Sequence, residues 1–286
     1  MGRTAWIVAL GSAVLMAGCS GAAPTDSSAS SGSTASSSPS SASASPAGDP
    51  LRLVVIGDSI PFNSKDDCPG CTAFVYQYSD ALARATGKKV EPDNLSDHTG
   101  LTLPRLLDEL DSQSPTLAKA DAIIVAIAHN SIELNQDAPC GSPVDPATGT
   151  LSDWSKIDQK CATASAAAYR ARYDQLFSTI AGLRAGKPTI LIALNKYNDW
   201  VGGEGTNLTP DQAQRTVTVH DAWNSMLCDS AKANSFTCAD IYHAFNGPTG
   251  EKPSGDLLAG DYTHPSQKGN DEITRVLVER GFAPLM

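Results

Sequence analysis

Residues 51–60 read Leu-Arg-Leu-Val-Val-Ile-Gly-Asp-Ser-Ile, an apolar run that ends in a Gly-Asp-Ser tripeptide. The run has the length and the β-branched residues of a buried strand, and Gly-Asp-Ser is a common turn from a strand into a helix. Ser59 therefore follows the first predicted strand. At this position a serine serves either as an ordinary helix cap or as a catalytic nucleophile, and only the rest of the chain distinguishes the two.

A candidate base for such a nucleophile stands near the C-terminus, where residues 261–265 read Asp-Tyr-Thr-His-Pro. A serine hydroxyl is almost entirely protonated at neutral pH, so an imidazole must accept its proton during attack. We predict that His264 is this base. Asp261 lies three residues earlier, close enough to bind one ring nitrogen, fix the tautomer and leave the other nitrogen to face Ser59.

Ester hydrolysis also needs hydrogen-bond donors for the oxyanion of its tetrahedral intermediate. Gly100 follows the second predicted strand, and a glycine lets its backbone N–H approach a ligand closely. Asn130 follows the apolar run at residues 121–128 and contributes a side-chain amide. We predict that Ser59 N–H, Gly100 N–H and the Asn130 side chain form the oxyanion hole.

The order of these motifs resembles that of the SGNH (GDSL-type) esterase/lipase family, in which Ser, Gly, Asn and His follow one another along the chain. Here they are Ser59, Gly100, Asn130 and His264, and the resemblance extends from about residue 51 to the C-terminus. One motif departs from the family pattern, since residues 128–131 read Ala-His-Asn-Ser instead of Gly-x-Asn-Asp. The resemblance implies a serine esterase or lipase that hydrolyses carboxylic esters through an acyl-enzyme on Ser59.

The N-terminal residues predict the cellular compartment. Arg3 precedes an apolar stretch over residues 5–16, and Ala-Gly-Cys follows at residues 17–19. This pattern is typical of a bacterial signal peptide, here residues 1–18, with a lipoprotein cleavage box, and the stretch is shorter than the roughly 18 residues of a spanning helix. We predict an exported lipoprotein that faces the extracytoplasmic side of the cell membrane, or is released from it, and that contacts the membrane only through lipidated Cys19.

Two further regions follow the signal peptide. Residues 19–50 are rich in Ser and Ala and have too little apolar surface to fold, so we predict a disordered tether. Residues 51–286 are long enough for one α/β domain with a single core. We therefore assign residues 51–286 to the SGNH hydrolase domain.

Within this domain, apolar β-branched runs alternate with helical patterns. Predicted strands lie at residues 51–56, 89–95, 123–127, 189–194 and 236–242, and predicted helices at residues 74–86, 103–110, 162–183, 210–233 and 266–280. The alternation predicts an α/β fold, a three-layer α/β/α flavodoxin-like domain with a mostly parallel five-stranded sheet. Ligands bind beyond the carboxyl ends of such strands, which is where Ser59, Gly100 and Asn130 are expected.

The chain has 7 Cys, and setting Cys19 aside leaves six, an even number that predicts disulfides in an exported protein. Many connectivities are compatible with six cysteines. Pairing in sequence order is the simplest, and it gives Cys68–Cys71, Cys140–Cys161 and Cys228–Cys238. The first pair also fits a redox-active dithiol or half of a zinc site, but neither a thioredoxin-like context nor a second ligand pair is evident, so we favour a structural disulfide.

Charge and histidine spacing exclude several other functions. The formal net charge of -10 disfavours nucleic acid as a partner, because phosphate binding needs clustered Lys and Arg. A neutral ester, whether a small molecule, a lipid or a glycan, suits an acidic protein better. The other histidines show no His-x-x-x-His spacing, so we expect no metal and no cofactor. We expect His98, His220 and His243 to be solvated or locally hydrogen-bonded, whereas His129 adjoins Asn130 and could touch the substrate. We expect a monomer.

Two alternatives to a carboxylesterase or lipase stay open from the sequence. The same catalytic residues would serve a deacetylase that removes O-acetyl groups from cell-wall or plant polysaccharides. A lipoprotein of this fold without turnover would instead be a solute-binding module.

Overall fold

The computed structural model describes most of the chain from residue 48 onward. The described residues are 48–134, 140, 153–201 and 208–286. The predicted signal peptide, the lipidation site Cys19 and residues 19–47 of the predicted tether lie outside them. Among the described residues, no helix combines the length and the hydropathy needed to cross a membrane.

The strands form one five-stranded sheet in the order β2-β1-β3-β4-β5, and every neighbouring pair is parallel. The strands are β1 (Leu51–Gly57), β2 (Val90–Asn94), β3 (Ala122–Ala126), β4 (Ile190–Leu194) and β5 (Thr237–Ala239). The predicted α/β fold with a five-stranded sheet is thereby confirmed. This strand order places the switch between the two winding directions at β1 and β3, where doubly wound sheets bind their ligands.

The helices occupy the segments between and after the strands. They are α1 (Ser59–Phe62), α2 (Phe74–Thr86), α3 (Leu103–Leu117), α4 (Gln159–Leu183), α5 (Pro210–Ala233), α6 (Ile241–Asn246) and α7 (Gln267–Glu279), with short 3₁₀ turns at Trp154–Lys156 and Gly255–Leu257. The start of α5 is sharply defined because the Thr209 hydroxyl accepts a hydrogen bond from Gln212 N while the Gln212 side chain accepts one from Thr209 N.

The predicted boundaries differ most from the structure at α3 and β5. The helix predicted at residues 103–110 continues to Leu117, because its apolar face continues through Leu117, which is fully buried. The strand predicted at residues 236–242 is limited to β5. Asp240 ends it by accepting a hydrogen bond from His243 N, which caps the start of α6.

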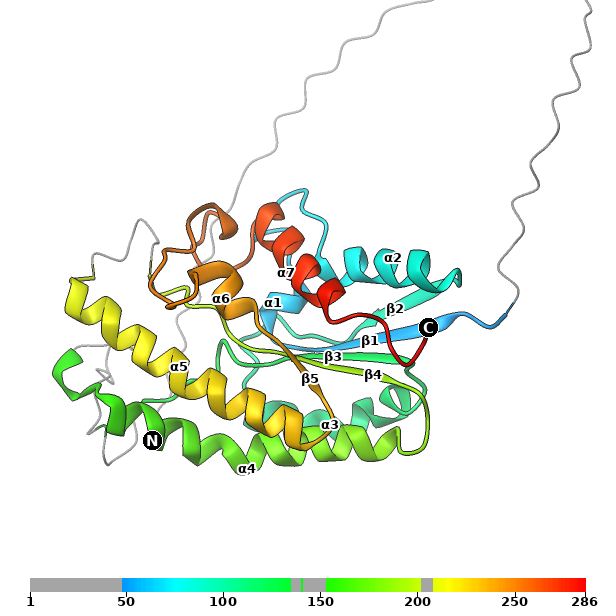
Figure 1. Ribbon diagram of the computed structural model, residues 1–286, viewed down its shortest axis with the longest axis horizontal. Helices are drawn as coiled ribbons and strands as arrows, with labels where there is room; N and C mark the ends of the chain where they lie inside the picture. The colour runs from blue at the N-terminus through cyan, green and yellow to red at the C-terminus, as the bar shows by residue number, and fades with distance from the viewer. Residues whose placement is uncertain (1–47, 135–139, 141–152, 202–207) are drawn as a thin grey trace, which may run out of the picture. The chain divides into compact units, whose positions relative to one another are not determined.

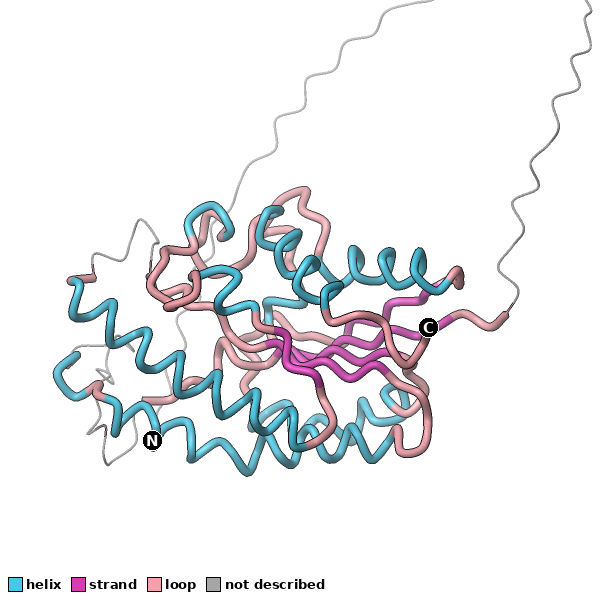
Figure 2. The backbone as a smooth tube through the Cα atoms, viewed as in Figure 1, coloured by secondary structure: helices cyan, strands magenta, loops and turns pink. Residues whose placement is uncertain are grey.

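The sheet lies between two layers of helices (Figures 1 and 2). On one face, Val54 and Ile56 of β1 belong to the core formed with α3, α4 and α5. On the other face, Leu53 and Val55 belong to the core formed with α2, α6 and α7. Successive side chains of a strand point to opposite faces, so a strand buried on both faces must be apolar at every position. This is why β1 is apolar and buried from Leu53 to Ile56, whereas Arg52 near its start is exposed.

Three disulfides join the cysteine pairs predicted from sequence order. They are Cys68–Cys71, Cys140–Cys161 and Cys228–Cys238, with Cα–Cα distances of 5.5, 4.6 and 5.3 Å. The first closes a turn between α1 and α2, the second reaches the first turn of α4, and the third joins α5 to β5. The alternatives of a dithiol or a zinc half-site at Cys68 and Cys71 are therefore replaced by a disulfide.

Candidate active site

The predicted nucleophile lies at the carboxyl end of β1. A Cβ atom on Gly57 would lie 2.0 Å from the backbone oxygen of Ala126 in β3, so the close approach of the two strands requires glycine. Asp58 N then donates to the same oxygen at 3.1 Å. The chain turns directly into α1, whose first residue is Ser59, and 9% of the Ser59 surface is exposed.

Asp58 connects this turn to the loop after β3. One of its oxygens accepts a hydrogen bond from Ile60 N at 3.1 Å, and the other accepts from Ala128 N at 3.1 Å and His129 N at 3.0 Å. Its side chain is fully buried. Burial raises the pKa of Asp58 to about 6, against the opposing effect of these three N–H groups and the charge of Lys196. The sequence alone gave no role to this carboxylate beyond the turn.

The two other predicted oxyanion residues lie on loops that contact each other. The Asn130 side chain donates to Leu101 O at 3.2 Å, next to Gly100 in the chain. Gly100 has φ +73°, a left-handed conformation that favours glycine. Ser131, which stands where the family pattern has Asp, accepts a hydrogen bond from Leu103 N at 2.9 Å at the start of α3. Ser131 therefore links the loop after β3 to the start of α3.

The C-terminal motif forms a compact turn before α7. Asp261 accepts hydrogen bonds from Thr263 N and His264 N, both at 3.0 Å, and its second oxygen lies 2.5 Å from His264 Nδ1. Partial burial acts to raise the pKa of Asp261, but the His264 ring and the two N–H groups outweigh it, so the pKa lies below its ordinary value. Asp261 is accordingly ionised and in contact with the His264 ring, and its spacing from His264 predicted this contact.

The remaining ring nitrogen of His264 points away from Asp261. Its Nε2 atom is buried and, among the described residues, has no hydrogen-bond partner, so Ser59 and His264 are not hydrogen-bonded to each other. Asp67 Oδ2 lies 3.6 Å from this nitrogen and 2.7 Å from His98 Nε2. Sequence reasoning missed Asp67 entirely and treated His98 as an isolated, locally hydrogen-bonded residue. The one sequence feature that could have drawn attention to Asp67 is its position directly before Cys68, the first cysteine of a predicted disulfide.

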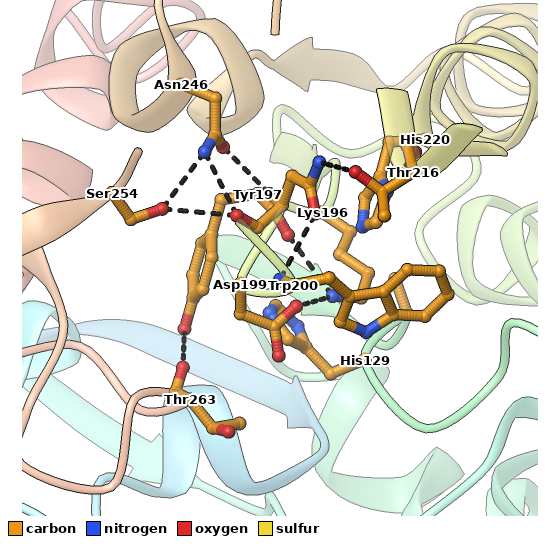
Figure 3. Close-up of polar contacts among 12 residues, drawn as sticks. His129, Lys196, Tyr197, Asp199, Trp200, Thr216, His220, Asn246, Ser254 and Thr263 are labelled. Carbon is orange, nitrogen blue, oxygen red and sulfur yellow. Dashed lines mark hydrogen bonds and ion pairs between the residues drawn. The ribbon is translucent and has the colours of Figure 1, made fainter. Parts of the chain in front are cut away.

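A layer of buried polar side chains supports the turn that carries His264 (Figure 3). Tyr197, which follows β4 and is fully buried, donates its hydroxyl to Thr263 O at 2.6 Å. Beside it, the buried Lys196 ammonium group pairs with Asp199 and donates to Tyr197 O at 3.2 Å. These contacts fix the position of the turn relative to the sheet.

His129 is part of the same layer. Its ring packs edge-on against Tyr197 with 4.5 Å between the ring centroids (Figure 3). Burial, together with the charge of Lys196, lowers the pKa of His129 well below its ordinary value, so the ring is neutral. The structure packs this ring against Tyr197, and a contact between His129 and the substrate stays a prediction.

Comparison with known proteins identifies the family. Residues 55–272 match the model of the GDSL-like lipase/acylhydrolase family. The chain belongs to this family. The resemblance inferred from the four motifs is thereby confirmed, and the protein is a carboxylic ester hydrolase.

Solved structures of GDSL lipases and esterases share the fold. A lipase from the goat rumen metagenome is 19% identical with a TM-score of 0.63, and the match covers 82% of this chain and all 100% of that one. An extracellular lipase from Streptomyces rimosus is 17% identical (TM-score 0.54; 80% and 99% covered), and an acetyl xylan esterase from Geobacillus stearothermophilus is also 17% identical (TM-score 0.52; 81% and 95% covered). No curated protein matches the sequence.

The raised pKa of Asp58 predicts a pH-dependent stability. The folded protein holds the Asp58 proton more tightly than the unfolded chain, with a pKa of about 6 against 3.8. Its stabilising contribution is therefore full below pH 3.8 and is lost as the pH rises through 6, by up to about 3 kcal/mol. We expect the Tm of wild type minus that of Asp58→Asn, measured by thermal unfolding, to increase as the pH falls from about 8 to about 4. A Tm difference between the two proteins that does not change with pH would contradict the raised pKa of Asp58.

The Tyr197 hydroxyl is predicted to position the turn that carries His264. Tyr197→Phe keeps the ring but removes the bond to Thr263 O, so we expect a loss of about 1 kcal/mol in unfolding free energy and about a tenfold lower kcat, with KM little changed. Tyr78→Phe is the matched control, because the buried Tyr78 hydroxyl has no hydrogen-bond partner among the described residues. Equal kcat values for the two variants on one soluble ester would argue against a positioning role.

Proposed function

We propose that the protein is a serine esterase that forms an acyl-enzyme on Ser59, with His264 as the general base and Asp261 as its orienting group. The observation that carries this proposal is the contact of 2.5 Å between Asp261 and His264 Nδ1. It assigns the proton to Nδ1 and leaves Nε2 with the lone pair that a general base needs. Membership of the GDSL-like lipase/acylhydrolase family supports the same chemistry.

The reaction then proceeds in two half-reactions. Ser59 Oγ attacks the ester carbonyl carbon while His264 Nε2 takes its proton, and the tetrahedral intermediate collapses when the imidazolium gives that proton to the departing alcohol. In the second half, His264 deprotonates a water molecule that attacks the acyl carbon, and the proton returns to Ser59 as the acid leaves. Asp261 stays ionised and stabilises the imidazolium in both steps.

The oxyanion of both intermediates is assigned to Ser59 N–H, Gly100 N–H and the Asn130 amide. The hydrogen bond from Asn130 to Leu101 O supports this grouping, because it holds the amide beside the residue that follows Gly100. Removing one such donor typically raises the barrier by about 2.7–4 kcal/mol.

A fluorophosphonate probe tests the nucleophile. Only an activated serine attacks phosphorus at a useful rate, so we expect labelling of wild type at Ser59 and no labelling of Ser59→Ala. Circular dichroism confirms that both proteins are folded. A folded wild type that stays unlabelled and hydrolyses no ester would favour the solute-binding module instead.

Two variants separate the base from its orienting group. His264→Ala should leave activity near background, since no other group then moves the proton. Asp261→Ala should be milder, because a backbone carbonyl takes over part of the task of orienting the ring. Turnover of both variants on one short-chain ester provides the comparison. Wild-type turnover in His264→Ala would show that another group is the base.

The substrate is proposed to be either a short-chain or lipid ester or an O-acetylated polysaccharide. Lipases and acetyl xylan esterases both occur among the structures that share this fold, so the comparison supports both candidates. A panel of p-nitrophenyl esters from acetyl to palmitoyl, tested beside acetylated xylan, decides between them. Acetate release from xylan together with a preference for p-nitrophenyl acetate would support the deacetylase, and a preference for long acyl chains would exclude it.

We further propose that the protein is an exported lipoprotein anchored through Cys19. The three disulfides support export, because such bonds persist mainly outside the cytoplasm. Mass spectrometry of the membrane-bound protein should find a lipidated Cys19 as the first residue, and Cys19→Ala should abolish the anchor. An unmodified Cys19 within an intact N-terminus would contradict the proposal.

A further inference from the structure

Three potential metal ligands converge beside the candidate base. One ligand atom each from Asp67, His98 and His264 lies within 4.8 Å of the others. Asp67 Oδ2 is 2.7 Å from His98 Nε2 and 3.6 Å from His264 Nε2. The two imidazole rings are stacked, with 5.7 Å between their centroids and 27° between their planes. The sequence predicted no metal site because no two histidines share a helical spacing, yet these ligands come together from separate loops.

The fold holds each of the three loops in place. Asp67 lies between α1 and α2, beside the disulfide Cys68–Cys71 that closes this loop. His98 follows Asp97, whose N–H donates to Gly57 O at 3.0 Å, so its loop is attached to the end of β1. His264 lies on the turn before α7, which Asp261 organises. The ligands are therefore presented by loops that the protein's own contacts hold in place.

The donor set matches the preferences of zinc. Zn²⁺ takes imidazole nitrogens and carboxylate oxygens at about 2.0–2.2 Å, so neighbouring ligands of a tetrahedral ion lie about 3.3–3.5 Å apart. The distances from Asp67 Oδ2, 2.7 and 3.6 Å, lie on either side of this value. Three protein ligands leave the fourth position of a tetrahedral ion open to water or another small ligand.

The state of His264 is independent support for a ligand role. Its Nε2 atom is buried and, within the described part of the chain, has no hydrogen-bond partner. Its Nδ1 atom is bound by Asp261, which is the carboxylate–histidine arrangement that orients metal-binding imidazoles and raises their basicity.

We propose that Asp67, His98 and His264 form a Zn²⁺ site that inhibits the esterase. Zinc would coordinate the lone pair on His264 Nε2, and this is the lone pair that accepts the Ser59 proton. For His98 Nε2 to bind zinc, the proton that it shares with Asp67 must move to Nδ1, so that the ring coordinates as a neutral imidazole. The inhibition rests on the proposed function of His264 as the general base. The binding of zinc rests only on the positions of the three ligands. The site is therefore a reversible control on the catalytic base, set by the free zinc concentration.

Isothermal titration calorimetry with ZnCl₂ tests the site directly. The full-length chain carries Cys19→Ser throughout, so that this thiol cannot bind the metal. We expect one site in this parent protein, and an affinity lower by about tenfold or more in His98→Ala and in Asp67→Asn. His243→Ala is the matched control, because His243 forms an exposed His–Asp pair of 2.6 Å with Asp240 and does not belong to the cluster of Asp67, His98 and His264. An unchanged affinity in His98→Ala would overturn the proposal.

Ester hydrolysis tests the inhibition, with each protein compared with its own zinc-free rate. Saturating ZnCl₂ should remove most of the activity of the parent protein and of His243→Ala, and EDTA should restore it. At the same zinc concentration, His98→Ala and Asp67→Asn should retain their activity, and CaCl₂ should inhibit none of the proteins. Zinc binding without inhibition, or with activation, would overturn the inhibitory role. Calorimetry needs no turnover, so it decides the site even if Ser59 is not the nucleophile.

Discussion

The active site depends on the burial of one carboxylate, that of Asp58. Its two oxygens accept backbone N–H groups from Ile60 on one side and from Ala128 and His129 on the other. Backbone donors buried at the ends of two strands would be costly without an acceptor. Satisfying them with one side chain fixes the turn that carries Ser59 against the loop after β3. Burial also disfavours the charged form of this carboxylate, and it therefore raises the pKa of Asp58 to about 6.

Near the C-terminus, His264 is likewise held by buried or partly buried polar groups. Asp261 binds one ring nitrogen, and the Tyr197 hydroxyl donates to the backbone of the same turn. A ring held in this way has one tautomer, and its Nε2 lone pair has no hydrogen-bond partner among the described residues. That lone pair is what a general base needs and also what a metal ion needs. The proposed zinc site beside Asp67 is therefore a consequence of the same geometry that suits His264 to catalysis.

The sequence by itself determined the parts of this protein that depend on short-range patterns. Apolar runs located all five strands, and the apolar periodicity with its flanking caps located the helices Phe74–Thr86 and Pro210–Ala233 to the residue. The contact between Asp261 and His264 was also predictable, because three residues of chain bring the two groups within reach. Predictions were less accurate at α3 and β5, where burial or a capping side chain decides the boundary.

Only the tertiary structure decided which loops meet. The contacts of Asp58 with the loop after β3, of Tyr197 with Thr263, and of Asp67 with His98 join segments that are distant along the chain. Periodicity identifies a strand but not its neighbour, and it is the strand order that selects which carboxyl-end loops lie side by side. The sequence could therefore name the chemical groups of the site, but their assembly, and the cluster of ligands around His264, follows from the packing of the sheet.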